Sequence, residues 1–162
     1  MAKITAYNEI TTPASTDILY LVSDPGGSPV GKKLQIANLG QVLAVPVAIS
    51  AVFDGSDAAL TTGTVVHVYV PYSGTITAAT MIADQTGSLV IDVWKDTYAN
   101  YPPTAADTIT ASAKPTISSA IKSQDSTLTG WTTAIDAGDV IAFSVDSVTD
   151  ITWAQITLSI TV

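Results

Sequence analysis

The sequence predicts an all-β protein, in which an antiparallel, jelly-roll-like β-sandwich follows a small N-terminal β-hairpin. Three observations predict this class. Short stretches rich in Val, Ile, Thr and aromatic residues recur along residues 47–162, at a spacing typical of two packed antiparallel sheets. No sustained 3.6-residue periodicity of the kind that marks amphipathic helices is present. Near the N-terminus, two short β-like stretches flank the Pro- and Gly-rich turn 23–29.

Residues 1–43 are predicted to form an N-terminal module. The strand 17–22 ends at the turn, where Pro presets φ and Gly accepts a positive φ, and the strand 31–36 returns as its hairpin partner. Residues 37–43 are expected to form one or two helical turns. Because one hairpin cannot bury a core of its own, this module must pack on the rest of the chain or on another subunit.

Residues 44–162 are predicted to form the β-sandwich domain, and a short Pro-containing junction joins it to the module. A chain of this length can bury a sizeable core without disulfides or metals. The expected strands are runs of β-favouring residues bounded by turn residues, and they span 47–53, 64–71, 75–83, 88–95, 107–111, 126–133, 139–146 and 151–162.

Three of these assignments carry further expectations. Residues 84–87 contain Asp and Gly and are predicted to form a turn between two strands. The strand 64–71 has apolar residues on both faces, which predicts a central position in its sheet. In the last strand, Ile156, Leu158 and Ile160 alternate with Thr and Ser, so one face should be buried and the other should face water or a partner.

Composition excludes several classes of partner. The net charge is −8 with six lysines and no arginine, which argues against nucleic acid because phosphate neutralisation needs clustered cations. No apolar run approaches the length of a membrane-spanning helix, and the N-terminus lacks an apolar signal core, so no membrane partner and a cytosolic origin are expected. Charged residues make up only 12% of the chain. Because few charges protect its unpaired sheet edges, we expect partner molecules to cover these edges in an assembly.

No residue pattern predicts catalysis, a metal or a cofactor. His67 is the single histidine and lies between two valines, which indicates a structural strand histidine hydrogen-bonded to a neighbour. Most aspartates follow turn residues, where they cap the backbone. Asp92 lies inside a strand and is expected either to face solvent or to pair with Lys95. There is no nucleophile elbow and no phosphate-binding loop, so the protein is predicted not to be an enzyme.

The best candidate for a contact site is the loop that follows the strand 88–95. Tyrosine offers a flat contact area at little entropic cost, so such a loop suits stacking on sugars or docking on a partner protein. The alternative is that the tyrosines anchor the loop on its own sheet while the prolines stiffen it. The candidate contact residues, with a tryptophan as a wall of the site, are Tyr98, Asn100, Tyr101, Pro102, Pro103 and Trp131.

Two groups of segments resemble structural proteins of tailed-bacteriophage virions. The first group resembles an N-terminal module of these proteins and comprises KITA (3–6), TPAS (12–15), DILYLV (17–22), DPGG (24–27) and KKLQIANL (32–39). The second resembles a β-sandwich domain that recurs in them and comprises ADQTGS (83–88), DVWKD (92–96), YPP (101–103), DTIT (107–110), KP (114–115) and Trp131. Together these segments sample most of the chain, but they are not specific to one position in the virion.

The resemblance implies a capsid decoration (cement) protein or a fibre, commonly a homotrimer, with no catalytic residues. One anchor-like module and one sandwich without a shaft favour a cement protein, which binds the major capsid protein at the capsid surface of a virion assembled in the host cytoplasm. The alternative is a short head or tail fibre whose sandwich binds a host-surface glycan. A glycan-cleaving enzyme ranks last, because no carboxylate lies in an apolar context.

Overall fold

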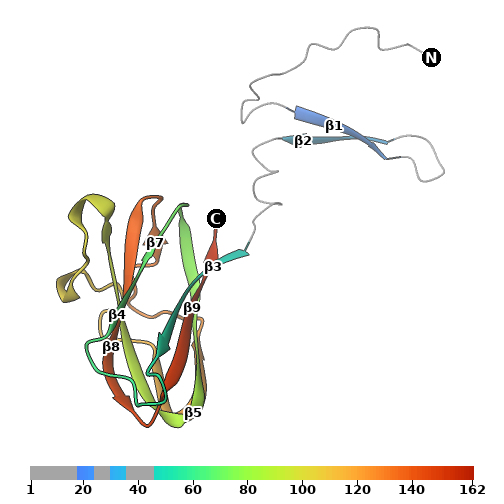
Figure 1. Ribbon diagram of the computed structural model, residues 1–162. Coiled ribbons are helices and arrows are strands. Elements are labelled where there is room, and N and C mark those ends of the chain that lie inside the picture. Colours follow the sequence, from blue (N-terminus) through green and yellow to red (C-terminus); the bar gives the residue numbers. More distant parts are fainter. Residues whose placement is uncertain (1–17, 24–29, 36–45) are drawn as a thin grey trace. The chain divides into compact units, whose positions relative to one another are not determined.

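The computed structural model describes residues 18–23, 30–35 and 46–162, and most of these residues lie in antiparallel β-strands (Figure 1). The chain divides into two units, Met1–Ala44 and Val45–Val162. The only helical elements in the described part are two single 3-10 turns. The expectation of an all-β chain is therefore confirmed for the described residues.

The first unit contains the strand pair β1 (Ile18–Ser23) and β2 (Val30–Gln35). The strands are antiparallel, with Ile18 opposite Gln35 at one end and Ser23 opposite Val30 at the other. This pairing agrees with the predicted hairpin partners, with each strand displaced by one residue. The connecting turn and the helical turns expected at 37–43 lie outside the described residues.

The second unit is a seven-stranded antiparallel sheet. Its strands follow the order β3-β9-β5-β8-β4, and β6 and β7 also pair with β5. The strands are β3 (Pro46–Asp54), β4 (Val65–Tyr69), β5 (Gly74–Thr97), β6 (Thr116–Asp125), β7 (Ala134–Ile135), β8 (Asp139–Thr149) and β9 (Trp153–Thr161). Two 3-10 turns, η1 (Tyr98–Asn100) and η2 (Ala105–Asp107), lie between β5 and β6.

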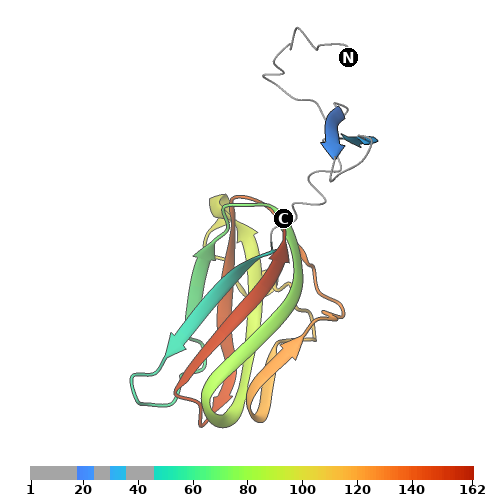
Figure 2. The same cartoon turned by 90° about the vertical axis from the view of Figure 1, so that its right-hand side faces the viewer.

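The sheet curls because β5 is a single bent strand of 24 residues. Figure 2 shows β5 turning through the lower end of the sheet. Its first half pairs with β9 as far as Ala83, and its second half pairs with β8 from Ser88 onward. The predicted turn at 84–87 is wrong as a break between two strands, because these residues lie inside β5, although the chain does reverse its direction there (Figure 2). Its residues lie where the ladder passes from β9 to β8, so Asp and Gly bend the strand without ending it.

The bend is held by contacts to the β8–β9 connection. The Asp84 carboxylate accepts hydrogen bonds from the backbone N–H groups of Thr152 (3.3 Å) and Trp153 (3.1 Å). The side chain of Thr152 also donates to this carboxylate. These hydrogen bonds, led by that of the Thr152 hydroxyl, hold the pKa of Asp84 below its ordinary value. Gly87 passes close to the carbonyl oxygen of Thr149, where an ideal Cβ would lie only 2.4 Å away.

One continuous apolar core joins the two halves of the curled sheet. The expected alternation in the last strand is confirmed, since Ile156, Leu158 and Ile160 are almost completely buried while the residues between them are partly accessible. The largest fully buried side chains come from both halves of the sheet and from the loops that close it, and they are Phe53, Phe143, Ile76, Met81, Leu89, Ile91, Ile117, Ile135, Ile141, Ile151, Ile156 and Leu158.

The predicted central position of the strand 64–71 is wrong. The corresponding strand β4 pairs with β8 alone, so it lies at an edge of the sheet. Its inner residues Val66 and Val68 pack against the core. Its outer residues His67 and Tyr69 face the aromatic side chains that follow β5, which explains why the outer face carries few polar residues.

Two predicted strands, 107–111 and 126–133, are not formed. The first region holds the end of η2 and a single bridge between Thr108 and Trp94. A strand that was not predicted from the sequence, β6, pairs with β5 instead. β6 is an edge strand that is mostly open to solvent, and it has only one fully buried apolar residue, Ile117. Because most of its other residues are Ser, Lys, Gln and Asp, its sequence lacks the apolar pattern that predicts a strand.

Candidate functional site

Four aromatic side chains surround an open hollow beside the sheet edge formed by β4. The hollow has a volume of about 460 Å³ and is lined by His67, Tyr69, Tyr98, Tyr101 and Val140. The three tyrosines are 57%, 70% and 53% exposed in sequence order, whereas Val140 at the base is buried. Because four aromatic side chains gather at one exposed place, the hollow is the candidate contact site among the described residues.

Three segments far apart in the sequence build this hollow. His67 and Tyr69 occupy alternate positions of β4 and therefore project from the same face of the sheet. Tyr98 and Tyr101 lie in the segment that follows β5, which runs beside β4 and β8 (Figure 1). Val140 of β8 lies opposite Tyr69 in the strand register and forms the floor.

The aromatic side chains meet in two edge-to-face pairs. The rings of His67 and Tyr101 have centroids 5.2 Å apart and an interplanar angle of 64°. The rings of Tyr69 and Tyr98 have centroids 6.2 Å apart and an interplanar angle of 89°. This geometry brings the positive edge of one ring to the negative face of the other, which is an arrangement that aromatic pairs prefer.

Backbone and side-chain hydrogen bonds hold the tyrosine-bearing segment in place. The Asp96 carboxylate accepts hydrogen bonds from the Thr97 N–H (2.7 Å) and from Asn100 Nδ2 (3.1 Å). The Tyr98 N–H donates to the carbonyl of Gly138 at 3.0 Å. The aromatic rings are therefore presented by an ordered segment, although most of their surface is accessible to solvent.

The lining of the hollow carries no formal charge when its histidine is neutral. An ion pair joins Lys95 Nζ to the carboxylate of Asp139, the residue immediately before Val140, at 3.1 Å. Asp139 also accepts a hydrogen bond from the Asp136 N–H at 2.9 Å. This carboxylate is buried and engaged by its partners, so the hollow offers aromatic faces, phenol hydroxyls and an imidazole as its recognition groups.

The other predicted contact residues are placed differently. Asn100 positions the loop through Asp96, Pro102 is exposed outside the lining, and Pro103 is buried as an anchor. Trp131 is partly buried against the core, and its Nε1–H donates to the carbonyl of Ala113 at 2.9 Å. Trp131 is thus not a wall of the hollow formed by the tyrosines.

The prediction of Tyr98 and Tyr101 missed their partners, His67 and Tyr69. The interpretation of His67 as a structural strand histidine placed no other aromatic residue beside it, whereas its ring packs against Tyr101. A signal was present in the sequence. His67 and Tyr69 are two positions apart on one strand face, and that face was the one with a polar residue among the valines.

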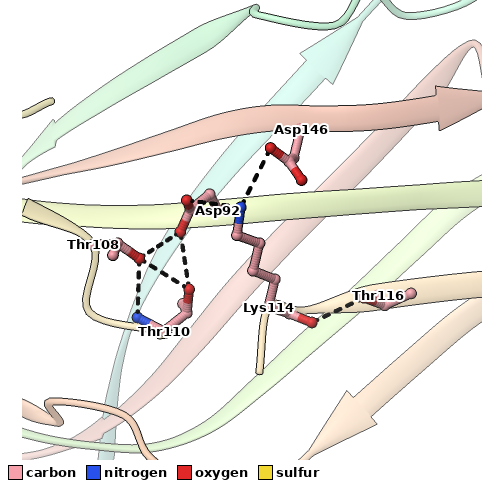
Figure 3. A network of polar contacts seen from close by, with 6 residues as sticks. All are labelled: Asp92, Thr108, Thr110, Lys114, Thr116 and Asp146. Atoms are coloured by element: carbon pink, nitrogen blue, oxygen red, sulfur yellow. Dashed lines mark hydrogen bonds and ion pairs between the residues drawn. The ribbon is translucent and has the colours of Figure 1, made fainter. Parts of the chain in front are cut away.

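A polar network is centred on the buried Asp92 of β5 (Figure 3). Asp92 accepts hydrogen bonds from the hydroxyls of Thr108 (2.7 Å) and Thr110 (2.9 Å). Its other oxygen lies 3.1 Å from Lys114 Nζ, which also reaches Asp146 at 3.3 Å. The network ties the segment before β6 to the strands β5 and β8.

Both expectations for Asp92 are therefore wrong. Its side chain is only 8% exposed and its partner is Lys114, whereas Lys95 pairs with Asp139. Burial by itself raises the pKa of Asp92, but the hydrogen bonds from Thr108, Thr110 and Lys114 outweigh burial and lower the pKa below its ordinary value of 3.8. The hydrogen bond to Asp92 in turn raises the pKa of Lys114 above 10.5.

These shifts predict how stability depends on pH. A carboxyl group whose pKa is lowered by folding stabilises the protein above its unfolded pKa, and this contribution is lost as the pH falls through the folded pKa. The Asp92 contribution should therefore be complete at pH 6 and decline below about pH 4. Urea unfolding of the wild type and of Asp92→Asn between neutral and acidic pH measures it.

The acid-induced loss of stability should be smaller in Asp92→Asn than in the wild type, because an asparagine at this position does not take up a proton. The loss should not vanish, because the other carboxylates, including Asp84 and Asp107 with their lowered pKa values, remain in both proteins. If the free energy of unfolding falls with pH equally in the two proteins, Asp92 does not make the predicted contribution. At the alkaline end the sign reverses, since the Lys114 contribution is complete below pH 10.5 and is lost as the pH rises above that value.

A metal site and a membrane-spanning helix are both absent from the described ranges 18–23, 30–35 and 46–162. That part of the chain has no group of three or more His, Cys, Asp or Glu side chains placed to hold a metal ion. It also has no helix long and apolar enough to cross a membrane. Comparison with known proteins assigns no relative: no protein-family model matches the chain, and no curated protein matches it.

Proposed function

We propose that the protein is a structural protein of a tailed-bacteriophage virion, namely a capsid decoration (cement) protein that binds the major capsid protein on the outer shell. The observation that carries this proposal is the contrast between the two units. Val45–Val162 has a large core of its own, whereas the described part of Met1–Ala44 is one pair of strands. A single strand pair is marginally stable in water, so it is suited to gaining stability where it attaches.

Within this proposal the second unit is a jelly-roll-like β-sandwich. The two halves of β5 would belong to opposing sheets, one built with β3 and β9 and the other with β4 and β8. Support comes from the ladder, which passes from β9 to β8 at the bend of β5, and from the single core that joins both halves. The protein acts without catalysis in this role.

The assembled form is proposed to be a homotrimer. One outer face of the curled sheet supports this, because it carries a row of uncharged side chains across four neighbouring strands, Ser50, Thr157, Thr80 and Gln124. Ser50 and Thr157 share a hydrogen bond of 2.9 Å, and Gln124 donates to Thr80 at 3.0 Å. Copies with a net charge of −8 can approach across such a face without opposing like charges.

Virions that lack the protein are expected to release their DNA at a lower temperature than decorated virions, while their adsorption to host cells stays nearly intact. A ligand that binds the assembled shell and not its separate subunits stabilises the shell by mass action. The measurement is the fluorescence of a DNA-binding dye during heating of both kinds of particle. Adding back the purified full-length protein is the control, and it should restore the higher release temperature.

A second candidate is a short head or tail fibre that binds a host-surface glycan, and the exposed aromatic hollow is the observation that favours it. In that case undecorated particles would be as heat-stable as decorated ones, and replacement of Tyr98 and Tyr101 by Ala would abolish adsorption. This pair of results would replace the cement proposal. Undecorated particles that lose heat stability but adsorb normally would support the cement proposal.

A further inference from the structure

We propose that the hollow lined by His67, Tyr69, Tyr98, Tyr101 and Val140 is a binding site for one sugar ring of a neutral saccharide. The inference goes beyond shell decoration. It supplies the ligand chemistry that the fibre alternative needs, but it does not depend on the position of the protein in the virion. It also replaces the predicted contact set, because it includes His67 and Tyr69 and excludes Trp131.

The shape of the site suits a small amphipathic ligand. Its volume of about 460 Å³ lies within the range of small-molecule sites, which are mostly apolar with a few polar groups at their margin. The two edge-to-face pairs, His67 with Tyr101 and Tyr69 with Tyr98, stand above the buried floor at Val140. A ligand that enters between them meets ring faces as well as ring edges.

The chemistry of the lining matches a sugar ring on both of its sides. A pyranose presents axial C–H groups on one face and hydroxyls around its rim. The negative face of a tyrosine ring attracts such C–H groups, while phenol hydroxyls and an imidazole exchange hydrogen bonds with the rim. The hollow combines three exposed tyrosines with one histidine, so a single sugar ring can make both kinds of contact there.

Charge selects a neutral sugar over an acidic one. No lysine lines the hollow, and the nearby ammonium group of Lys95 is already paired with Asp139. The chain carries a net charge of −8, which repels sialylated and sulfated glycans from its surface. Acidic sugars would therefore enter a site that has no cation to compensate their charge.

The surroundings favour a small ligand over a protein partner. The exposed apolar residues Val52, Ile82 and Ile121 lie on β3, on the first half of β5 and on β6, none of which contributes to the hollow. The hollow is therefore not the centre of a broad apolar patch. Stable protein interfaces bury about 800 Å² on each partner around such a centre.

The site is also organised before a ligand arrives. Asp96 holds Thr97 and Asn100, and the Tyr98 N–H is bonded to the carbonyl of Gly138. Binding therefore requires little ordering of the loop, which would otherwise reduce affinity. Exposed aromatic rings on an ordered segment meet the requirement for a modest but specific sugar site.

The test uses the purified full-length protein. Labelled protein is applied to an array of neutral, sialylated and sulfated glycans, and amide chemical shifts are followed by NMR during titration with maltose, lactose, cellobiose and N,N′-diacetylchitobiose. We expect binding to neutral glycans only, with shifts centred on the β4 residues 67–69, on 98–101 and on 138–140. Tyr98→Ala should weaken the affinity about tenfold, whereas Tyr98→Phe should retain most of it because the ring remains.

Ile121→Ala is the matched control, since Ile121 is 50% exposed and lies on β6, which has no residue in the hollow. Tyr98 is 70% exposed, so its removal should leave the thermal midpoint nearly unchanged and the loss of binding can be read directly. The inference is overturned if no array glycan and no disaccharide binds, if acidic glycans are preferred, if Tyr98→Ala binds like Ile121→Ala, or if a partner protein alone occupies the hollow. None of these results depends on the heat stability of virions.

Discussion

Replacement of Lys114 by Met is expected to lower the free energy of unfolding by about 3 kcal/mol. The Asp92 carboxylate is 8% exposed and would keep its two threonine donors but lose its cation. Breaking a buried pair by removing one partner typically costs 3–5 kcal/mol, and the 29% exposure of the lysine side chain places this variant at the lower end. Urea unfolding followed by tryptophan fluorescence measures the change.

Two companion variants make the result specific. Lys122→Met removes an exposed lysine on β6 and should change the stability by no more than about 0.5 kcal/mol. The double variant Asp92→Asn with Lys114→Met should recover part of the loss, because no uncompensated charge remains in the sheet. If Lys114→Met costs no more than Lys122→Met, the network does not hold the segment before β6 to the sheet.

A Gly87→Ala substitution is expected to cost about 3 kcal/mol, because the added methyl group has no room at the bend of β5. Its Cβ would lie 2.4 Å from the carbonyl oxygen of Thr149 and 2.7 Å from Ile151 Cγ1. The first contact is with backbone, which cannot rotate away as a side chain can. The curled sheet must therefore open where the ladder passes from β9 to β8.

Gly63→Ala provides the contrast for this prediction. No atom lies within 4 Å of the position its Cβ would take, but its φ of +85° penalises any side chain. Its expected cost is about 1 kcal/mol, from backbone conformation alone. Equal losses in the two variants, measured by the same urea titration, would show that crowding at Gly87 does not shape the bend.

These two positions also separate the fold from the proposed roles. Neither Lys114 nor Gly87 lines the aromatic hollow, so destabilised variants that still fold at low temperature should keep their sugar binding. Tyr98→Ala should do the opposite, with normal stability and weakened binding. The pattern distinguishes residues that build the sheet from residues that contact a ligand.

The β class, and the residues that face the core in the clearest strands, could be predicted from the sequence alone. In β9 the alternation of Ile156, Leu158 and Ile160 with polar residues was sufficient, because side chains of a strand point to opposite faces with a period of two. The sequence also singled out Tyr98 and Tyr101, since two tyrosines in a polar loop stand out without knowledge of the fold. Such features are local and can be read from neighbouring residues.

The neighbours of each strand, and the polar groups that meet across the sheet, could not be predicted from local sequence. Periodicity reports the two faces of a strand but not its position in a sheet, so β4 was placed at the centre although it lies at an edge. The bend of β5 through 84–87 depends on the approach of the β8–β9 connection, which is distant in sequence. The partners of Asp92, and the meeting of His67 with Tyr101, depend on the same long-range pairing, because a contact across the sheet leaves no local pattern in the chain.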